Sequence, residues 1–273
     1  MSCDATQLYA LGADEEETAR LRRQSEELRP EAEALLARIG LRPGQSAVDL
    51  GCGPSGILGL LAAAVSPSGT VVGVDANAAH VGAARQATAS LRNVSVLAGD
   101  ARHTGLPDDA FDLVHARTLL VTIPSPAEVI TEMIRIARPG GWIARQEPDA
   151  GHAVCYPPLP EWDRLTEVFR VGFTRSGADL LLGRRLPAML WQAGLDDVEV
   201  TVHSGCYPAG HSRRTVIPDL VRSLRPVILD LGLADDRELT RIDRAVREHL
   251  ADPRVLMMPH LLVTAVARRP RDR

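Results

Sequence analysis

A glycine-rich turn constrains the fold of this chain more than any other feature. Residues 46–50 are largely apolar and β-forming, residues 51–56 carry glycine at positions 51, 53 and 56, and residues 56–65 suit a helix. A strand, a glycine turn and a helix in this order bring the backbone close to an extended polar ligand. Because the G-x-G-x-x-G pattern also occurs in dinucleotide sites, the ligand must be identified from the neighbouring residues.

Strands and helices continue to alternate after this turn. Short apolar segments predict further strands, and the segments between them predict helices. The strands are expected over 70–75, 94–98, 111–115 and 142–146, and the helices over 77–90 and 126–138. Near-continuous apolar strands that alternate with helices are typical of a parallel sheet covered on both faces. The sequence therefore predicts an α/β fold built on a doubly wound sheet.

The remainder of the chain is less regular and predicts a cap. We expect one helix over 14–40, a loop over 148–162, a helix over 185–193, a strand over 197–203, helices over 216–231 and 235–250, and a final strand over 261–267. The helices between the last two strands form an insertion, which would cover the ligand crevice together with the N-terminal helix. We therefore divide the chain into an N-terminal helical lid (1–40), a ligand-binding core (41–207 and 255–273) and a helical cap insertion (208–254).

Composition excludes several classes of function. The net charge is −4, whereas binding to nucleic acid needs a basic surface, so no nucleic-acid partner is expected. The chain contains no lysine, which excludes Schiff-base catalysis and a P-loop lysine. The four cysteines lack the spacing of zinc sites or disulfide frameworks, and no segment has the pattern of a secretory signal or a membrane span. We therefore expect a cytoplasmic protein without a metal site or a membrane partner.

Three carboxylates stand at the ends of three successive expected strands. Asp49 precedes the first glycine by two residues, where it suits a cationic ammonium or sulfonium better than a pyrophosphate, and Pro54 removes an amide that a phosphate would need. Asp75 suits the hydroxyls of a ribose, which nicotinamide and adenosyl ligands share. Asp100 can accept a hydrogen bond from an adenine amino group. Since the carboxyl ends of parallel strands line one crevice, these residues predict a nucleoside-bearing ligand with a cationic end.

Together these motifs resemble those of a class I S-adenosylmethionine-dependent methyltransferase. The resemblance rests on segments 48–56, 73–75, 99–101, 106–114 and 138–142, whose order and spacing match across residues 45–147. The branch is similar to the methyltransferases of ubiquinone and menaquinone biosynthesis and their small-molecule relatives. The resemblance implies S-adenosylmethionine as cofactor. It also implies a mostly parallel seven-stranded sheet with helices on both faces, in which residues 261–267 form the antiparallel seventh strand. The sequence departs from the family at Ser55, where glycine is usual, and at Ala76, where a larger side chain often packs against adenine.

The resemblance also implies cofactor-binding residues, grouped here by the part of the cofactor that they would contact. They are Asp49, Gly51 and Gly53 for the methionine part, Asp75 for the ribose, Asp100 and Ala101 for the adenine, Ala76 at the position where the family often packs the adenine, Arg117 and Thr118 for the sulfonium side, and Gln24 in an N-terminal lid that also holds Tyr9.

The acceptor side is less sharply defined by the sequence. Glu147, at the end of the fifth expected strand, and His152, on the loop after it, are candidates for a base or an orienting group, and Tyr9 is a candidate for closing over the cofactor. His115 is expected in the core and His80 on a solvated helix face. His249 is likewise expected on a solvated helical segment. His203, Tyr207 and His211 suit structural roles better than catalytic ones. The cap arginines, which suit either solvated positions or a site for an acidic or phosphorylated substrate, are Arg213, Arg214, Arg222 and Arg225.

The expected function is methyl transfer by in-line displacement to an oxygen, nitrogen or carbon atom of a small molecule, such as a specialised metabolite. One alternative is an NAD(P)-dependent oxidoreductase, against which Asp49, Pro54 and Asp100 argue. Another is a non-catalytic module that binds S-adenosylmethionine. The acceptor and the oligomeric state, for which a homodimer is one option, stay open.

Overall fold

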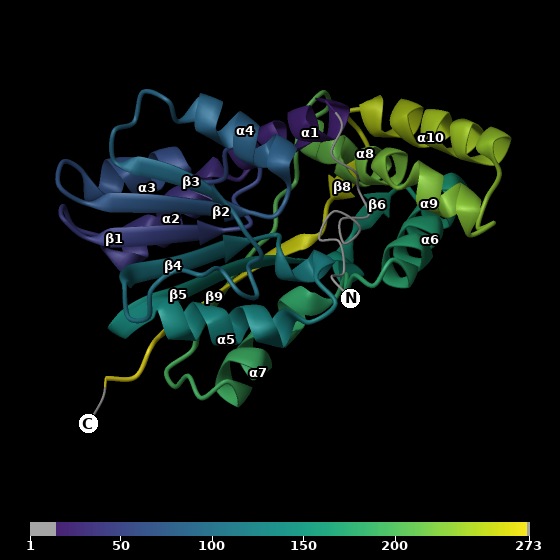
Figure 1. Cartoon of the computed structure of the whole chain (residues 1–273). Coiled ribbons are helices and arrows are strands. Elements are labelled where there is room, and N and C mark those ends of the chain that lie inside the picture. Colours follow the sequence, from purple (N-terminus) through teal and green to yellow (C-terminus); the bar gives the residue numbers. More distant parts are fainter. Residues whose placement is uncertain (1–14, 272–273) are drawn as a thin grey trace.

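A seven-stranded sheet forms the centre of the protein (Figure 1). The computed structural model describes residues 15–271. The strand order is β3-β2-β1-β4-β5-β9-β7, with bounds β1 Ser46–Leu50, β2 Thr70–Asp75, β3 Val94–Ala98, β4 Phe111–Arg117, β5 Ala137–Asp149, β7 Glu199–His203 and β9 Leu261–Arg268. The first five of these strands run parallel, and β9 lies antiparallel between β5 and β7. The doubly wound sheet and its antiparallel seventh strand are therefore confirmed.

The register of the parallel strands places their carboxyl ends at one edge of the sheet. Leu50 of β1 is paired with Val74 of β2 and with Ala116 of β4, and Asp75 is paired with Ala98 of β3. The loops that follow these four strands consequently open side by side. A ligand crevice is expected at this edge of an open α/β sheet.

Helices cover both faces of the sheet (Figure 1). On one face α2 (Arg29–Ile39), α3 (Leu58–Val65) and α4 (Ala78–Ala87) share a core with β1, β2 and β3. On the other face α5 (Pro126–Ile136) and α7 (Leu182–Gln192) share a core with β4, β5 and β9. Apolar side chains that recur every three or four residues produce these faces, as in α3, which buries Leu58, Leu61, Ala62 and Val65.

Two expectations about the helices were wrong. The single helix expected over 14–40 is divided into α1 (Glu15–Glu27) and α2, because Pro30 in the first turn of α2 has no amide hydrogen to continue an earlier helix. The region after β5 was expected to be a loop as far as residue 162, but α6 begins at Pro160 and runs to Arg175. Its apolar stripe of Trp162, Leu165, Phe169 and Phe173 has helical spacing, a signal that the sequence analysis missed.

A second hydrophobic core lies beside the sheet and belongs to the cap. It is formed by α6, α8 (Val216–Ser223), α9 (Arg225–Asp230) and α10 (Asp236–Ala251), with the small antiparallel sheet of β6 (Val154–Tyr156) and β8 (Leu256–Met258) packed nearby. Helix α6 comes from the range assigned to the core in our division of the chain, yet it packs against α8 and α10. The division into lid, core and cap stays a prediction.

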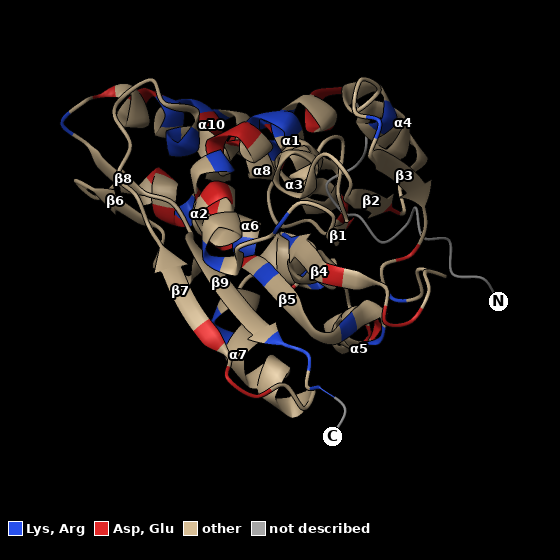
Figure 2. Ribbon diagram, turned by 90° about the vertical axis from the view of Figure 1, so that its left-hand side faces the viewer, with Lys and Arg blue, Asp and Glu red and all other residues tan. Residues whose placement is uncertain are grey.

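Charged residues of both signs alternate over the surface. Figure 2 shows acidic and basic residues interspersed along α1 and α10, as their sequences dictate. Within residues 15–271, no helix is both long enough and apolar enough to cross a membrane.

Candidate functional site

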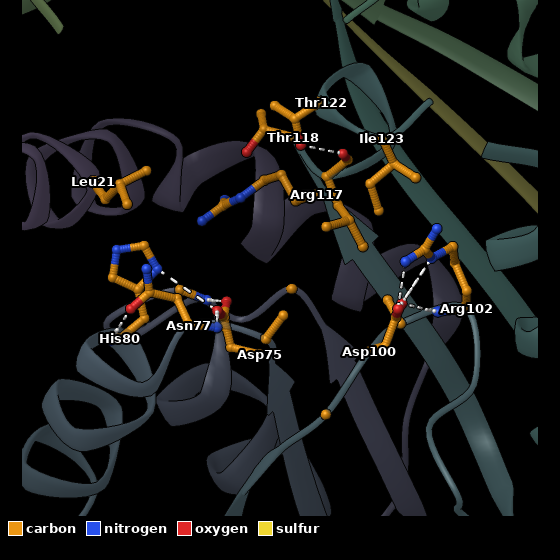
Figure 3. Close-up of a pocket in the computed structure, with 16 residues that line it drawn as sticks. Leu21, Asp75, Asn77, His80, Asp100, Arg102, Arg117, Thr118, Thr122 and Ile123 are labelled. Atoms are coloured by element: carbon orange, nitrogen blue, oxygen red, sulfur yellow. Dashed lines mark hydrogen bonds and ion pairs between the residues drawn. The ribbon is translucent and has the colours of Figure 1, made fainter. Parts of the chain in front are cut away.

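A cleft opens at the carboxyl edge of the sheet, where the loops after β1, β2, β3 and β4 meet (Figure 3). It holds about 930 Å³ of empty space, including the solvent at its open mouth. The residues that line it are Leu21, Gly51, Gly53, Asp75, Ala76, Asn77, His80, Gly99, Asp100, Ala101, Arg102, Arg117, Thr118, Leu119, Thr122 and Ile123. We call this space the cofactor cleft.

The glycine turn forms the floor of the cofactor cleft and tolerates no side chain at its outer positions. Gly51 and Gly56 both have positive φ angles, of 66° and 50°. A Cβ on Gly51 would lie 2.6 Å from Cδ1 of Leu119, and one on Gly56 would lie 2.7 Å from the carbonyl oxygen of Cys52. Ser55 is not among the residues with positive φ, so serine fits at this departure from the family pattern.

Asp49 lies at the methionine end, beneath the turn. Its side chain is 2% exposed, its Oδ1 lies 2.7 Å from Nδ1 of His115, and its Oδ2 accepts a hydrogen bond of 3.2 Å from the amide of Ile57. The carboxylate also lines a smaller annex of the cleft together with Gln24. The expectation that His115 lies in the core is confirmed, and the site therefore places a buried histidine–carboxylate pair below the position expected for a cationic group.

Asp75 connects the glycine turn to the wall of the cofactor cleft. Its Oδ2 accepts a hydrogen bond of 2.8 Å from the amide of Gly53, and its Oδ1 accepts one of 2.8 Å from the amide of Asn77. Nδ1 of His80 lies 3.6 Å from the same carboxylate. His80 is 4% exposed and lines the cleft, so its expected place on a solvated face was wrong. Asp75 thus faces the cleft with a fixed carboxylate, which fits a group with two neighbouring hydroxyls.

Asp100 forms an ion pair at the opposite end of the cleft (Figure 3). Its Oδ2 lies 2.6 Å from Nη2 of Arg102, and the hydrogen bonds from Arg102 lower the pKa of the Asp100 carboxyl despite its partial burial. An adenine amino group would therefore share Asp100 with a guanidinium that the sequence analysis missed. Ala76, Ala101 and Ile123 supply the apolar part of this end.

Hydrogen bonds join α1 and the residue after it to the end of β4 beside the cleft. Nε2 of Gln24 donates a hydrogen bond of 3.3 Å to Oγ1 of Thr118, and Nη1 of Arg117 donates one of 3.1 Å to the carbonyl oxygen of Leu28. Burial lowers the pKa of the Arg117 guanidinium. Leu21 of α1 lines the cofactor cleft directly. The first described helix therefore covers the site, and Tyr9, the other lid residue expected from sequence, lies outside the described residues.

Thr118 adopts a backbone conformation that β-branched residues rarely take. Its φ angle is 51°, and its amide donates a hydrogen bond of 2.8 Å to the carbonyl oxygen of Gln146. The left-handed region costs side-chain-bearing residues about 1–2 kcal/mol. Such strain is common at functional sites, and Thr118 lines every cavity described here.

This strain is testable by comparing two variants that both lack the Thr118 hydroxyl. We expect the Thr118→Gly variant to be more stable than the Thr118→Ala variant by about 1 kcal/mol in free energy of unfolding. Only glycine adopts positive φ without a Cβ penalty. Urea unfolding at equilibrium measures the difference. An alanine variant as stable as the glycine variant would contradict the strained conformation.

A second cavity, which we call the cap cavity, adjoins the cofactor cleft. The two spaces share Leu21, Thr118 and Thr122, and the cap cavity holds about 530 Å³ of empty space. Its other lining residues come from α1, the loops after β4 and β5, and the cap: Arg20, Gln24, Val121, Pro148, Ala150, Phe169, Phe173, Leu180, Leu220 and His260. A largely apolar chamber therefore meets the cofactor cleft at Thr118.

Glu147 and His152, the two acceptor-side candidates from the sequence, lie outside the junction of the two spaces. The Glu147 side chain is fully buried, and its oxygens accept hydrogen bonds from the amides of residues 119, 120 and 121 at 3.3, 2.9 and 3.2 Å. His152 is exposed at the end of a short 3-10 helix, η3 (Ala150–His152). Neither residue lines the cofactor cleft or the cap cavity. The contacts of Glu147 indicate that it positions the loop after β4.

The sequence analysis overlooked His260, which lines the cap cavity just before β9. Burial, together with the charges of Arg213 and Arg20, lowers the pKa of the His260 imidazole to about 3. A lone histidine before an apolar strand carries no motif, so no local signal identifies it. At neutral pH the cap cavity therefore contains an uncharged imidazole, which can donate and accept hydrogen bonds.

His260 should make the fold sensitive to acid. The unfolded chain binds a proton at this histidine near pH 6.5, whereas the folded chain does so only near pH 3, so its contribution to stability falls as the pH decreases between these values. We expect His260→Gln to lose less stability than the wild type between pH 7 and pH 4. Urea unfolding at several pH values tests this, with His249→Gln as the control. Parallel pH profiles for wild type and His260→Gln would contradict the expected linkage.

Within residues 15–271, no group of three or more histidine, cysteine, aspartate or glutamate side chains has a geometry that could hold a metal ion. His203 is paired with Glu31, and the ring of Tyr207 lies against that of His211. These three sequence candidates line neither the cofactor cleft nor the cap cavity.

Comparisons with known proteins agree with this geometry. The family described as "Methyltransferase domain" matches residues 41–170, which contain β1 to β5 and the cofactor-cleft loops. A trans-aconitate 2-methyltransferase from Methylobacterium radiotolerans is 37% identical over 126 residues, which are 46% of this chain and 46% of that protein. A demethylmenaquinone methyltransferase from Geobacillus sp. is 35% identical over 111 residues, which are 40% of this chain and 47% of that protein.

The fold has a similar counterpart among solved structures. Phosphoethanolamine N-methyltransferase 2 of Haemonchus contortus, in complex with S-adenosyl-L-methionine, has a TM-score of 0.57 at 18% identity, over 89% of this chain and 53% of that chain. The chain spans about half the length of the curated relatives it matches. The motifs, the sheet order and these similarities agree, and residues 41–170 form a methyltransferase domain similar to those of class I S-adenosylmethionine-dependent enzymes.

Proposed function

We propose that this protein transfers a methyl group from S-adenosylmethionine to an oxygen, nitrogen or carbon atom of a small molecule. The observation that carries the proposal is the junction at Thr118, where the cofactor cleft meets the cap cavity. One space offers a glycine turn and carboxylates for a nucleoside, and the other offers an apolar chamber for an acceptor. The trans-aconitate and demethylmenaquinone methyltransferases among the relatives support a small acceptor.

The residues of the cofactor cleft fit S-adenosylmethionine part by part. Asp49 is a buried carboxylate at the end that would hold the methionine ammonium, and Asp75 presents its carboxylate to the ribose hydroxyls. Asp100 and Ala101 line the end of the cleft that would take the adenine. When bound, the cofactor supplies a methyl group activated by a sulfonium. These three carboxylates would select the cofactor by charge and hydrogen bonding.

The chain contributes alignment and exclusion of water more than acid–base chemistry. Thr118, Thr122 and Leu21 form the wall shared by the two spaces and so would set the approach of the acceptor to the methyl group. Helix α1 covers this junction through the hydrogen bonds of Ser25 with Arg117 and of Gln24 with Thr118. In-line displacement depends on such alignment, so a catalytic triad is not required.

Calorimetry distinguishes this function from the two alternatives. We expect adenosylhomocysteine to bind with a dissociation constant in the micromolar range or below, and NAD not to bind. Binding of NAD without adenosylhomocysteine would contradict the proposal and favour an oxidoreductase. Binding of adenosylhomocysteine without methyl transfer to any member of a broad acceptor panel would favour a non-catalytic module.

Three further expectations concern the protein outside its candidate site. The cytoplasmic location, the homodimer and the absence of a nucleic-acid partner, all expected from the sequence, stay predictions. Size-exclusion chromatography with light scattering tests the oligomeric state.

A further inference from the structure

The polar side chains of the cap cavity are cationic or neutral. Among the described residues that line it, the polar groups are those of Arg20, Gln24, Thr118, Thr122 and His260, and no aspartate or glutamate is included. A cationic amine that entered this chamber would lose its hydration without gaining a carboxylate partner, which is unfavourable. The lining therefore discriminates between acceptors by charge.

Arg213 does not line the cap cavity, but its positive charge acts on His260. It is 2% exposed on a short 3-10 helix, η4 (Ser212–Thr215), and its Nε and Nη1 have no hydrogen-bond partner among the described residues. The carboxylate of Glu27 lies 4.0 Å from Nη1, too far for a hydrogen bond. By contrast, Arg20 donates hydrogen bonds of 2.8 and 2.6 Å to the carboxylate of Glu17. The incompletely compensated charge near the chamber therefore belongs to Arg213.

The other arginines of the cap do not share this property. The guanidinium of Arg214 donates hydrogen bonds to backbone carbonyl oxygens at positions 207, 250, 252 and 255. Arg222 forms an ion pair with Glu16, and Arg225 forms one with Asp236. The arginine cluster seen in the sequence thus separates into structural members and Arg213, whose charge reaches His260.

The remaining wall of the cap cavity suits an apolar body. The rings of Phe169 and Phe173 lie 5.5 Å apart on α6, and Leu180 and Leu220 complete this side. Aromatic rings at this separation offer faces and edges to a further ring or an alkyl chain. The chamber is therefore apolar over its cap side and positive at the end that holds His260.

We propose that the cap cavity takes an apolar acceptor bearing an anionic oxygen, a carboxylate or an ionised phenol or enol, and that it rejects ammonium acceptors. This inference rests on the function proposed above. The imidazole of His260 would donate a hydrogen bond to the anionic oxygen, and the positive charges of Arg20 and Arg213, which both act on His260, would stabilise the anion. His260 is thus a positioning and specificity residue of the acceptor site.

The chemistry of the transfer agrees with an acceptor that enters as an anion. A lone pair of the acceptor oxygen forms the bond to the methyl carbon while the bond from this carbon to sulfur breaks, and its electron pair remains on sulfur. The negative charge of the oxygen and the positive charge of the sulfonium cancel, so no proton moves. A base is needed only when the acceptor must lose a proton, and the described lining offers no carboxylate for that task.

Three probes with the same apolar body test the charge preference: phenylpropanoate, phenylpropanol and phenylpropylamine. Each is titrated into protein saturated with adenosylhomocysteine, which lacks the sulfonium charge, so that any preference comes from the chain. We expect the acid to bind about tenfold more tightly than the alcohol, and the amine more weakly than the alcohol. Equal affinities, tighter binding of the amine, or no binding of any probe at millimolar concentration would overturn the inference.

Variants locate the preference within the cap cavity. We expect His260→Gln and Arg213→Gln to bring the affinities for acid and alcohol to within about threefold of each other. The matched controls, His249→Gln and Arg254→Gln, lie outside both spaces and should retain the tenfold preference. Leu220→Trp should fill the chamber and abolish binding of all three probes while adenosylhomocysteine still binds. Retention of the preference in both His260→Gln and Arg213→Gln would contradict the assignment.

The two proposals fail in different ways. If adenosylhomocysteine does not bind to the wild type, the proposed function is wrong. If adenosylhomocysteine binds and the amine binds as tightly as the acid, only the present inference is wrong. The comparison of probes uses the wild-type protein, so it remains decisive even if a variant does not fold.

Discussion

Asp75→Ala should lower the affinity for adenosylhomocysteine by about 10- to 100-fold, because hydrogen bonds to a charged group contribute about 1.5–3 kcal/mol. The wild-type carboxylate also accepts a hydrogen bond from the amide of Gly53, so its removal loosens the turn that forms the floor of the cleft. Binding and local order are therefore lost together. Calorimetry measures the affinity, and circular dichroism confirms that the sheet remains folded.

Two further variants make the test specific. Asp75→Asn retains one acceptor oxygen but loses the charge, and we expect an intermediate affinity. Asp196→Ala removes an exposed carboxylate from the loop before β7 and should leave the affinity unchanged. An Asp75→Ala protein that binds adenosylhomocysteine within about twofold of the wild type would exclude Asp75 from the ribose site.

Glu147→Ala should reduce the free energy of unfolding by about 3 kcal/mol or more, because each buried donor left without its acceptor costs about 1–3 kcal/mol. The amides of Leu119, Leu120 and Val121 would lose their acceptor. Arg145, fully buried on the same strand, would lose the carboxylate whose charge acts on its guanidinium. Urea unfolding measures the loss, and Glu128→Ala, which removes an exposed carboxylate from α5, is the control.

The same residue predicts a pH dependence. Burial raises the pKa of the Glu147 carboxyl from its ordinary value of 4.5 to about 7, against the opposing effect of the three amides and Arg145. The folded chain therefore holds a proton that the unfolded chain has released, and the contribution of Glu147 to stability falls as the pH rises from 4.5 to 7. Glu147→Gln should remove this slope. Unchanged stability of Glu147→Ala together with lost turnover would instead support the catalytic role expected from the sequence.

Much of the fold could be predicted because its signals are local. The strands over 46–50, 70–75 and 94–98 were expected at the bounds that the structure shows, since short apolar segments ended by glycine or aspartate leave little freedom. The positive φ angles within the glycine turn likewise favour glycine at positions 51, 53 and 56. Helix α6 was missed although its pattern is regular, because a proline-containing segment before it was extended too far.

Local sequence signals likewise predict some residues of the candidate site and not others. The residues at the ends of strands, Asp49, Asp75 and Asp100, reach the cofactor cleft or its annex because strand register carries them there. Glu147 also ends a strand, but its carboxylate turns toward three amides of the neighbouring loop. Position along a strand predicts which edge a residue occupies, and the direction of its side chain depends on which partners lie within reach.

The sequence by itself determined the sheet, the glycine turn and the class of cofactor, since each depends on residue types at fixed spacing along a short stretch of chain. Only the tertiary structure decided the character of the acceptor site. Arg20, Phe169 and His260 are far apart in the sequence and line one chamber through the packing of the cap on the sheet. The charge and pKa of such groups depend on burial and on neighbours distant in the chain, and neither quantity is contained in a local pattern.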